Sequence, residues 1–382
     1  MSAEKQVSVK QFGAAGNGIE DDSPAFRQAL DSGAEEVVIP SGTYKIGAVL
    51  AVGSNISIKA EQGAVIFLAD GACTGVQDFL LTNKDREKGN ECISVEGGIW
   101  NGNNKGNPRN SDIFDQTGYT GVMFNFVNVK NLSLRNMKLC DSESYFIRIG
   151  EADGFNISGI ELESIHLRPN QDGIHLGGFC TNGTIENISA SMAGSTNDDM
   201  IALNADDEVN RLVNLGMKRG PISNIKVRNI YAADCHTFIR LLSVDAEISN
   251  ITIENVSGGC RVFAVNIDAA RYCKTPLFKE EDKPMGVGNI HDVTIRNMCV
   301  HKTVDYKSPL ILIESNMDRF TIRDFKRDRA EEPANRVFTF SAGKQKPVTL
   351  SVNGRPAGLA QNERIEMDDD YFSEIQFISL KQ

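Results

Sequence analysis

The sequence predicts an all-β protein, a single-stranded parallel β-helix in which short strands wind into stacked coils. One observation is a phrase that returns along the chain, with Asn or Asp ahead of alternating apolar residues, the mark of a strand with one buried face. Another is a second family of short apolar strands that follows this phrase at a fairly constant interval. Two or three short strands in a unit of about 25 residues are typical of such a solenoid. A β-sandwich is the alternative, but it would need hairpin turns every 8–12 residues or so.

The N-terminal segment predicts a short helix. In "DDSPAFRQALDSG" (21–33), Ser23 is a plausible N-cap, Pro24 suits the first turn, and Gly33 suits a C-terminal stop. Because the end coil of a solenoid must be shielded, we expect this helix to cap the first coil.

The coils themselves are predicted from the two strand families. The first Asn or Asp of each returning phrase serves as a marker, and the markers lie 25, 68, 26 and 42 residues apart: Asn131, Asn156, Asn224, Asn250 and Asp292. A unit near 25 residues with insertions explains these steps, and an imperfect copy at 184–191 falls inside the longest one. The second strand family comprises 145–150, 172–177, 199–204, 237–243 and 262–268. We expect the asparagines to occupy left-handed corners and to stack as ladders.

The repeat fades after about residue 325. The segment 336–359 predicts antiparallel strands with a turn at Asn353-Gly354. No Pro/Ser-rich linker interrupts the chain, so we expect one domain over 1–382, with coils and N-terminal cap over about 7–325 and a C-terminal cap over about 326–382.

Charge and composition narrow the function. The net charge of −11 makes nucleic acid or an anionic membrane an improbable main partner, since both need a basic surface. A neutral ligand, or an anionic one met by a local basic patch, stays open. The eight cysteines lack close pairs and are expected to be small buried residues rather than a zinc site or a disulfide framework: Cys73, Cys92, Cys140, Cys180, Cys235, Cys260, Cys273 and Cys299. No metal or other cofactor is expected, and the sequence leaves the oligomeric state open.

The first residues, "MSAEKQVSVKQFG", contain no apolar run of the signal-peptide type, and no stretch approaches the length of a membrane span. The sequence as written is therefore expected to be soluble and cytoplasmic. A secreted or periplasmic location is expected instead if a signal segment precedes it.

Two Asp-led phrases, "NQDGIHLGG" (170–178) and "NDDMIALNADD" (197–207), predict a functional site. Asp172 and Asp199 lie 27 residues apart, which puts them on neighbouring coils about 5 Å apart, with Asp198 beside them. Three crowded acids raise the pKa of at least one, which supplies a general acid near neutral pH. A carboxyl separation of roughly 6.5–9.5 Å favours inversion, and one of about 5–5.5 Å favours retention. The predicted coil spacing allows either separation. The alternative is that these acids only satisfy turn amides.

Strand alternation predicts an outward column on the same coils. Arg148, His175 and Ala202 should point outward, and Arg240 should join them on the next coil, within one residue of register. Such a column would form the floor of a groove. The acidic runs 206–208 and 368–370 lack a stacked partner and are expected to be solvated surface.

From about residue 7 to 270 the chain resembles glycoside hydrolase family 28, the polygalacturonase-like enzymes with a right-handed β-helix. Its N-terminal segment is similar to one found in pectin-acting β-helix proteins. "GGIWNGNNKG" (97–106), "NQDG" (170–173) and "NDD" (197–199) resemble the family's Gly-Ile-Asp-Gly-Asn-Gly, Asn-Thr-Asp-Gly and Asp-Asp motifs.

The resemblance implies inverting hydrolysis, with Asp198 as general acid to the glycosidic oxygen and Asp172 and Asp199 holding and deprotonating the attacking water. Two motifs depart from the family. "CHT" replaces Gly-His-Gly, which makes His236 the supporting histidine. "RVF" replaces Arg-Ile-Lys, so Arg261 matches the arginine, while Phe263 removes a basic partner for a galacturonate carboxylate.

The remaining candidates keep two interpretations each. Arg148, Arg240 and Arg261 could clamp a sugar acid or merely pair with the acids, and His175 could line the groove or be an ordinary strand residue. Trp100 could stack on a sugar or belong to a cap or core. The other histidines are expected to be structural: His166, His291 and His301.

The leading hypothesis is a glycosidase acting on a plant-type or microbial polysaccharide, with exo action on galacturonides or related sugars as one form. A β-helix lyase or uronate epimerase is the first rival, and it would abstract the C5 proton of a uronate with a basic residue. A non-catalytic carbohydrate-binding β-helix of the tailspike or adhesin sort is the second.

Overall fold

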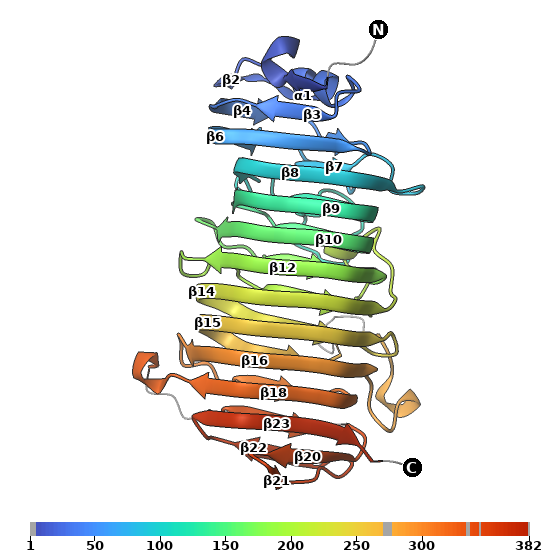
Figure 1. Cartoon of the computed structure of the whole chain (residues 1–382), viewed down its shortest axis with the longest axis vertical. Helices are drawn as coiled ribbons and strands as arrows, with labels where there is room; N and C mark the ends of the chain where they lie inside the picture. Colours follow the sequence, from blue (N-terminus) through green and yellow to red (C-terminus); the bar gives the residue numbers. More distant parts are fainter. Residues whose placement is uncertain (1–4, 270–276, 334–336, 344, 381–382) are drawn as a thin grey trace.

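The computed structural model describes residues 5–269, 277–333, 337–343 and 345–380. Its strands wind into one elongated stack of coils that runs from the N-terminal to the C-terminal end (Figure 1). The strands from β1 to β19 pair in parallel, and antiparallel pairs appear only where β20 to β23 take part. The fold is therefore all-β and a β-helix, as the repeat predicted. The handedness of the coil and the single-domain organisation stay predictions.

The chain begins with short elements at one end of the stack: β1 Gln6–Ser8, η1 Val9–Phe12, β2 Asn17–Asp21, α1 Ser23–Leu30, β3 Glu36–Ile39, β4 Gly42–Ile46 and β5 Leu50–Val52. Helix α1 is present, but the prediction of its N-cap was wrong by one residue: Asp22 is the N-cap. Ser23 is the first residue of the helix. Its hydroxyl accepts hydrogen bonds from the backbone N–H groups of Gly47 and Ala48 instead of capping the helix. The helix ends at Leu30, before Gly33.

The central coils consist of β6 Ile56–Leu68, β7 Leu81–Asn83, β8 Asn90–Asn101, β9 Phe124–Cys140, β10 Ile147–Glu163, β11 Ile174–Leu176, β12 Cys180–Ala190, β13 Asp199–Asn204, β14 Ile222–Leu242, β15 Ile248–Ile267, β16 Ile290–Lys302, β17 Ile311–Ile313 and β18 Met317–Arg327. Short helical turns lie at η2 Leu212–Asn214, η3 Glu280–Asp282 and η4 Arg329–Glu331. The inward register is confirmed, since Ile147, Ile174, Ile201 and Ile239 stack on successive strands and are fully buried.

The asparagine corners are confirmed at four of the five markers: Asn131, Asn224, Asn250 and Asp292 have positive φ. Asn156 does not, because Gly154 makes the corner there. The ladder is also present: the side-chain amide of Asn229 donates to Asn187, that of Asn255 to Asn229, and that of Asn297 to Asn255.

The C-terminal residues form antiparallel strands: β19 Phe340–Gly343, β20 Val348–Val352, β21 Arg355–Pro356, β22 Arg364–Met367 and β23 Tyr371–Ser379. The turn at Asn353-Gly354 joins β20 to β21, and both residues have positive φ, as a hairpin of this sequence requires. β23 pairs with the last long coil strand, β18. β19 still pairs in parallel with β17, so the coil pattern continues past residue 325. Residues 334–336, which include the start of the segment expected to form this cap, lie outside the described residues.

Most cysteines are small buried residues, as expected, and the seven described ones are free thiols. Cys92 and Cys299 are exposed, contrary to the prediction, because one makes a corner with positive φ and the other points outward from β16. Cys273 lies outside the described residues. Trp100 belongs to the core, where its indole N–H donates to the Gly97 carbonyl.

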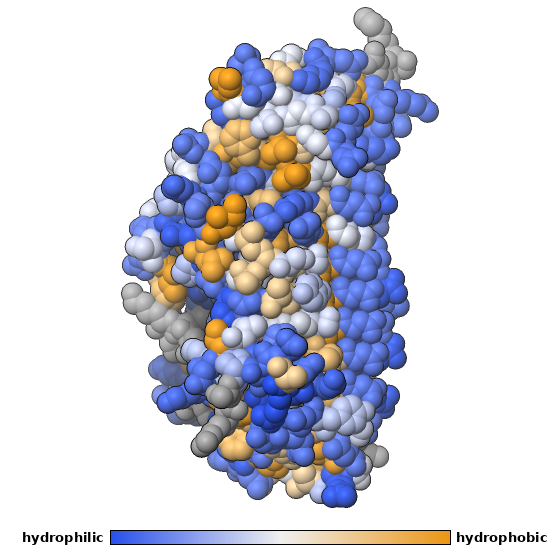
Figure 2. Space-filling view, turned by 90° about the vertical axis from the view of Figure 1, so that its left-hand side faces the viewer, coloured by the Kyte–Doolittle hydropathy of each residue, from blue (hydrophilic) through white to orange (hydrophobic). Residues whose placement is uncertain are grey.

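The outer surface differs between faces. Figure 2 shows a continuous hydrophilic band along the long axis, over the long strands of Figure 1, beside a more irregular face where hydrophobic and hydrophilic residues mix. Within the described residues, no helix is long and apolar enough to cross a membrane.

Candidate active site

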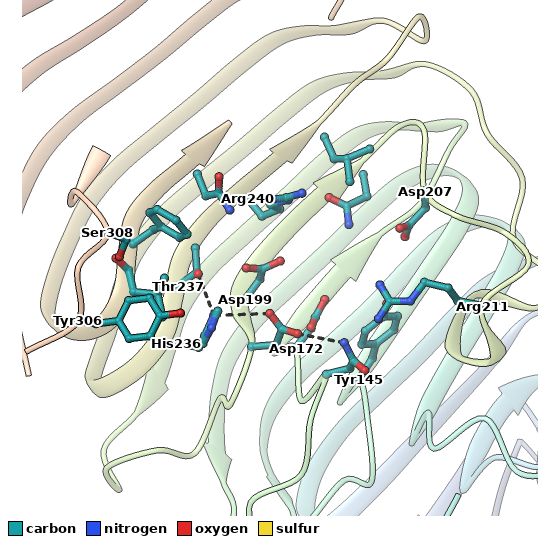
Figure 3. Close-up of a pocket in the computed structure, with 17 residues that line it drawn as sticks. Tyr145, Asp172, Asp199, Asp207, Arg211, His236, Thr237, Arg240, Tyr306 and Ser308 are labelled. Atoms are coloured by element: carbon teal, nitrogen blue, oxygen red, sulfur yellow. Dashed lines mark hydrogen bonds and ion pairs between the residues drawn. The ribbon is translucent and has the colours of Figure 1, made fainter. Parts of the chain in front are cut away.

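A pocket of about 430 Å³ lies over the short strands β11 and β13 and the C-terminal halves of β14 and β15 (Figure 3). All four residues predicted to be catalytic line it: Asp172, Asp198, Asp199 and His236. The structure therefore brings together acids and a histidine that the sequence distributes over three coils.

Backbone stacking sets the positions of the two buried acids. Asp172 precedes β11 and Asp199 begins β13, and the N–H of Gly173 donates to the carbonyl of Asp199 at 2.9 Å. A Cβ on Gly173 would lie 2.5 Å from the Met200 carbonyl oxygen, so only glycine allows the two coils to approach this closely. Asp172 is 3% exposed and Asp199 is 9% exposed.

Asp198 is the more accessible acid, with a side chain that is 27% exposed. Its Oδ2 accepts a hydrogen bond from the Asn170 amide at 3.1 Å, and its Oδ1 lies 3.6 Å from Nδ1 of His236. The backbone N–H of His236 donates to the Thr196 carbonyl at 3.0 Å, which ties the histidine to the segment that carries Asp198. The substitution of Thr for the family's second glycine in "CHT" therefore still places a histidine beside this acid.

The environment raises the pKa values of the buried acids. Burial, then the charges of Asp198 and Asp172, raise the pKa of Asp199 well above its usual range. Burial raises the pKa of Asp172 to about 7, although its hydrogen bond with His175 opposes the rise. Burial also lowers the pKa of His236, so this imidazole is more readily neutral. The acid cluster thus retains a proton near neutral pH, as its crowding predicted.

His175 is fully buried and does not line the pocket, so the interpretation as a groove residue was wrong. Its ring nitrogens lie 2.7 Å from Oδ2 of Asp172 and 2.7 Å from Oδ2 of Asp207. The ring stacks on Tyr145, with centroids 4.1 Å apart. Burial acts to lower the pKa of His175, but the charge of Asp207 and the two hydrogen bonds outweigh it and raise the pKa to about 9.

The expectation that 206–208 is solvated surface was also wrong, because all three acids are buried. After β13 the chain folds back over the short strands, and this brings Asp207 to His175. Asp206 accepts hydrogen bonds from three backbone N–H groups in the turn after β14, those of Val244, Asp245 and Ala246, each at 2.7 Å.

Arg240 lines the pocket, with its strand position opposite Ala202 and Asn266 as the register predicted. It is 7% exposed, and none of the described residues forms a hydrogen bond or ion pair with its guanidinium. The amide oxygens of Asn204 and Asn266, which also line the pocket, are buried without a partner in the described part of the chain.

The structure places the other two arginines elsewhere. Arg148 is 2% exposed and faces a second pocket of about 690 Å³, with its guanidinium donating to the Asn125 side chain and the Val213 carbonyl. The prediction that it shares a groove floor with the acids was wrong, because the segment containing Val213 covers the column at that coil. Arg261 forms an ion pair with Asp234 at 2.7 Å and does not line the acid pocket.

Sequence reasoning missed several pocket residues. Asn204 ends its strand phrase and Asn266 lies opposite Arg240, so both could have been found by extending the column alignment that located Arg240. Tyr145 begins the first strand of the same family. Arg211 and Tyr306 come from insertions without a repeat, so no pattern in the sequence placed them.

Among the described residues, Asp198, Asp199 and His236 are the group that could hold a metal ion, since one ligand atom of each lies within 4.8 Å of the others. These are the same groups that would carry acid/base chemistry. Two carboxylates and an imidazole at this spacing are compatible with either use.

Comparison with known proteins adds sequence and fold relationships. No family model matches the chain. A probable polygalacturonase from Arabidopsis thaliana is 26% identical over 259 residues, which are 65% of this chain and 50% of that protein. The chain thus spans about half the length of this curated relative. This similarity confirms the resemblance to polygalacturonase-like proteins that the Asp-led motifs indicated.

Two solved structures define the fold class. A hyperthermoactive exopolygalacturonase from Thermotoga maritima aligns with a TM-score of 0.53 at 14% identity, over 96% of this chain and 95% of its own. The surface protein and adhesin PfbA of Streptococcus pneumoniae aligns with a TM-score of 0.53 at 16% identity, over 89% and 87%. The chain therefore has the β-helix fold of these two proteins. Because a polygalacturonase and an adhesin share this fold, the fold alone does not decide between catalysis and binding.

Proposed function

We propose that the protein is a glycoside hydrolase that cleaves an oligosaccharide or polysaccharide by an inverting acid/base mechanism. The observation that carries this proposal is the convergence of Asp172, Asp198, Asp199 and His236 in one pocket, with two of the acids buried and raised in pKa. Crowded carboxyls that differ in exposure are suited to divide acid and base roles.

Asp198 is the general acid, because it is the most exposed of the three carboxyls and has His236 and Asn170 beside it. It donates a proton to the glycosidic oxygen as the bond from that oxygen to the anomeric carbon breaks. Asp172 and Asp199 hold a water molecule on the opposite face of the sugar. The water oxygen attacks the anomeric carbon from that face, which inverts the configuration. A proton of the water passes to a carboxylate.

The substrate carries an acidic sugar. Arg240 is a buried cation without a partner in the described residues, and a substrate carboxylate would supply the missing bidentate bond. The unpartnered oxygens of Asn204 and Asn266 would accept hydrogen bonds from sugar hydroxyls. Phe263 and Tyr306 also line the pocket and offer apolar surface to a sugar ring. Arg261, which the resemblance implied as a substrate ligand, instead holds the loop of Asp198 by donating to Asn197 at 2.8 Å.

A buried apolar cluster between the two pockets supports exo action. Val213 packs with Phe79, Val122 and Tyr145 in a buried apolar cluster. Tyr145 lines the acid pocket, whereas the residues that follow Val213 line the second pocket. A polymer seated at the acids could not continue through this cluster toward the N-terminal coils, so one chain end would stop there.

The test is digestion of a glycan panel by the wild type and by Asp198→Asn, with the anomer of the first product read by NMR. The proposal expects single sugars or short units of inverted configuration from the wild type and none from the variant. A retained configuration would contradict the mechanism, and an unsaturated product absorbing in the ultraviolet would indicate a lyase. Binding without turnover, unchanged by Asp198→Asn, would favour the non-catalytic alternative that the adhesin-like fold keeps open.

A further inference from the structure

His175 joins two carboxylates that lie at different places in the chain. Its Nδ1 contacts Oδ2 of Asp172 and its Nε2 contacts Oδ2 of Asp207, both at 2.7 Å. A neutral imidazole has one donor nitrogen and one acceptor nitrogen, whereas the imidazolium has two donors. Two ionised carboxylates at hydrogen-bond distance from both nitrogens therefore select the charged ring.

The surroundings hold this ring in place. Its plane lies 9° from that of Tyr145, with which it stacks, and it is fully buried. Arg148 and Ala202 occupy the neighbouring strand positions on either side. Rotation of the imidazole would break two charge-assisted hydrogen bonds at once, so one orientation is fixed.

The charged groups around the ring have opposite effects on the pKa values of the two carboxyls that it joins. Asp207 has a lowered pKa: burial would raise it, but the charge and hydrogen bond of His175, with Arg211 beside them, dominate. Burial raises the pKa of Asp172, and the negative charges of Asp198 and Asp207 add to this effect. Arg148, on the neighbouring strand, and Tyr145, which stacks on the ring, are further titratable groups beside it. The positive charge of His175 opposes protonation of Asp172.

We propose that His175 is a positioning residue, an imidazolium clamped between Asp207 and Asp172 that favours the ionised form of Asp172 and holds it in one orientation for use as a base. The clamp commits Oδ2 of Asp172 to the histidine and leaves Oδ1 for the water molecule in the pocket. Asp207 acts through His175, by holding the ring in its charged form. The catalytic consequence rests on the proposed hydrolase function, whereas the charge of the ring does not.

The first experiment reads the charge of the ring in the full chain. The protein has five histidines, so ¹⁵N imidazole spectra of the wild type and of His175→Gln identify the His175 signals by difference. We expect both nitrogens to be protonated at pH 7 and to lose a proton only near pH 9. In Asp207→Asn the proton should be lost at lower pH. A ring with a single protonated nitrogen at pH 7 in the wild type would overturn the proposal.

The second experiment reads the effect on Asp172 through the pH dependence of kcat/KM. The charge and hydrogen bond of His175 lower the pKa of Asp172, so their loss in His175→Gln raises this pKa and moves the acidic limb, which reports ionisation of the base, to higher pH. For each unit of this shift, activity on the acidic limb falls about tenfold and recovers as the pH rises, with KM unchanged. An acidic limb that stays in place would overturn the positioning role.

Asp206→Asn is the matched control, because Asp206 is a buried neighbour that accepts backbone N–H groups and has no hydrogen bond with His175. It should lower the melting temperature without moving the limb; an equal shift in both variants would overturn the proposal. If the Asp207 variant does not fold, the wild-type spectra still decide the charge of the ring. If the wild type cleaves no glycan, the proposed function fails, and the same spectra show whether the clamp exists.

Discussion

Two outward-facing regions of the same coils differ in how their charged side chains are arranged and buried. On the long strands, acidic and basic side chains form four exposed ion pairs between neighbouring strands; we name this set the charge column: Glu96 with Arg135, Glu186 with Arg228, Glu254 with Arg296, and Glu374 with Arg323. On the short strands, Asp172, Asp199 and Arg240 are buried, and like charges lie together. The same repeat can therefore build a solvated, balanced surface or a crowded, reactive pocket.

The difference arises from what covers each face. The arginines of the charge column are exposed to water, and exposed ion pairs contribute about 0–1 kcal/mol each. The short strands are overlaid by the segment after β13 and by insertions between coils, which remove water from their outward side chains. Burial raises the free energy of a charged group, so the charged side chains buried on the short strands are the ones expected to have a function.

The largest effect is expected for the exposed acid of the pocket. Asp198→Asn should lower kcat by about 10²- to 10⁴-fold, the usual contribution of a general acid, with substrate binding retained. Steady-state kinetics on the best substrate of the glycan panel measure this change. Glu254→Gln in the charge column is the matched control and should leave kcat unchanged; an equal loss in both variants would remove the distinction between the two regions.

A smaller effect is expected for the unpaired cation. Arg240→Met should raise KM for an acidic substrate by roughly 10- to 150-fold, the equivalent of the about 1.5–3 kcal/mol of a hydrogen bond to a charged group. A neutral analogue of the same sugar should bind equally well to both proteins. Arg296→Met, which removes a cation from the charge column, should change neither value. Loss of affinity for the neutral analogue as well would show that Arg240 supports the fold rather than the acidic group.

A further prediction concerns stability against pH. The folded-state pKa of Asp172 lies near 7, above its ordinary value of 3.8, so stability from this group is fully present below about pH 4 and is lost as the pH rises toward 7. Asp199 acts in the same direction. Thermal unfolding should therefore show a falling melting temperature across this window, and Asp199→Asn should flatten the slope and raise the melting temperature at pH 7. A slope that is the same in Asp199→Asn would mean that this acid ionises freely in the fold.

The smallest effect is expected in the charge column. Removing the pair of Arg296 and Glu254 by Arg296→Gln should cost less than about 1 kcal/mol of unfolding free energy, and added salt should reduce the difference. Denaturant unfolding with and without salt measures it. A loss of several kcal/mol would show that this face, too, contains strongly coupled charges.

Much of the fold could be predicted from the sequence, because a coil repeat fixes both the strand positions and their inward residues. The stacking of Ile147, Ile174 and Ile201, and the register that puts Arg240 opposite Ala202, follow from period-2 alternation alone. The acids of the pocket were found for the same reason, since they begin strands at matching places on neighbouring coils.

The remainder of the site depends on segments without a repeat. The burial of His175 and of Asp207, and the placement of Arg148 in a separate pocket, result from the chain between β13 and β14 folding over the short strands. Alternation tells which side chains point outward from a strand. It cannot tell whether water or another part of the chain lies above them, and this decides their charge state.

The most direct test of this account is the protonation of the pocket acids themselves. In protein labelled with ¹³C at the aspartate carboxyls, the signals that Asp172→Asn and Asp199→Asn remove can be followed through a pH titration without any substrate. We predict that Asp172 titrates near pH 7 and that Asp199 keeps its proton well above the ordinary range. Titration of both carboxyls below about pH 4, as expected for solvated aspartates, would contradict the claim that the coils crowd them into a proton-holding site.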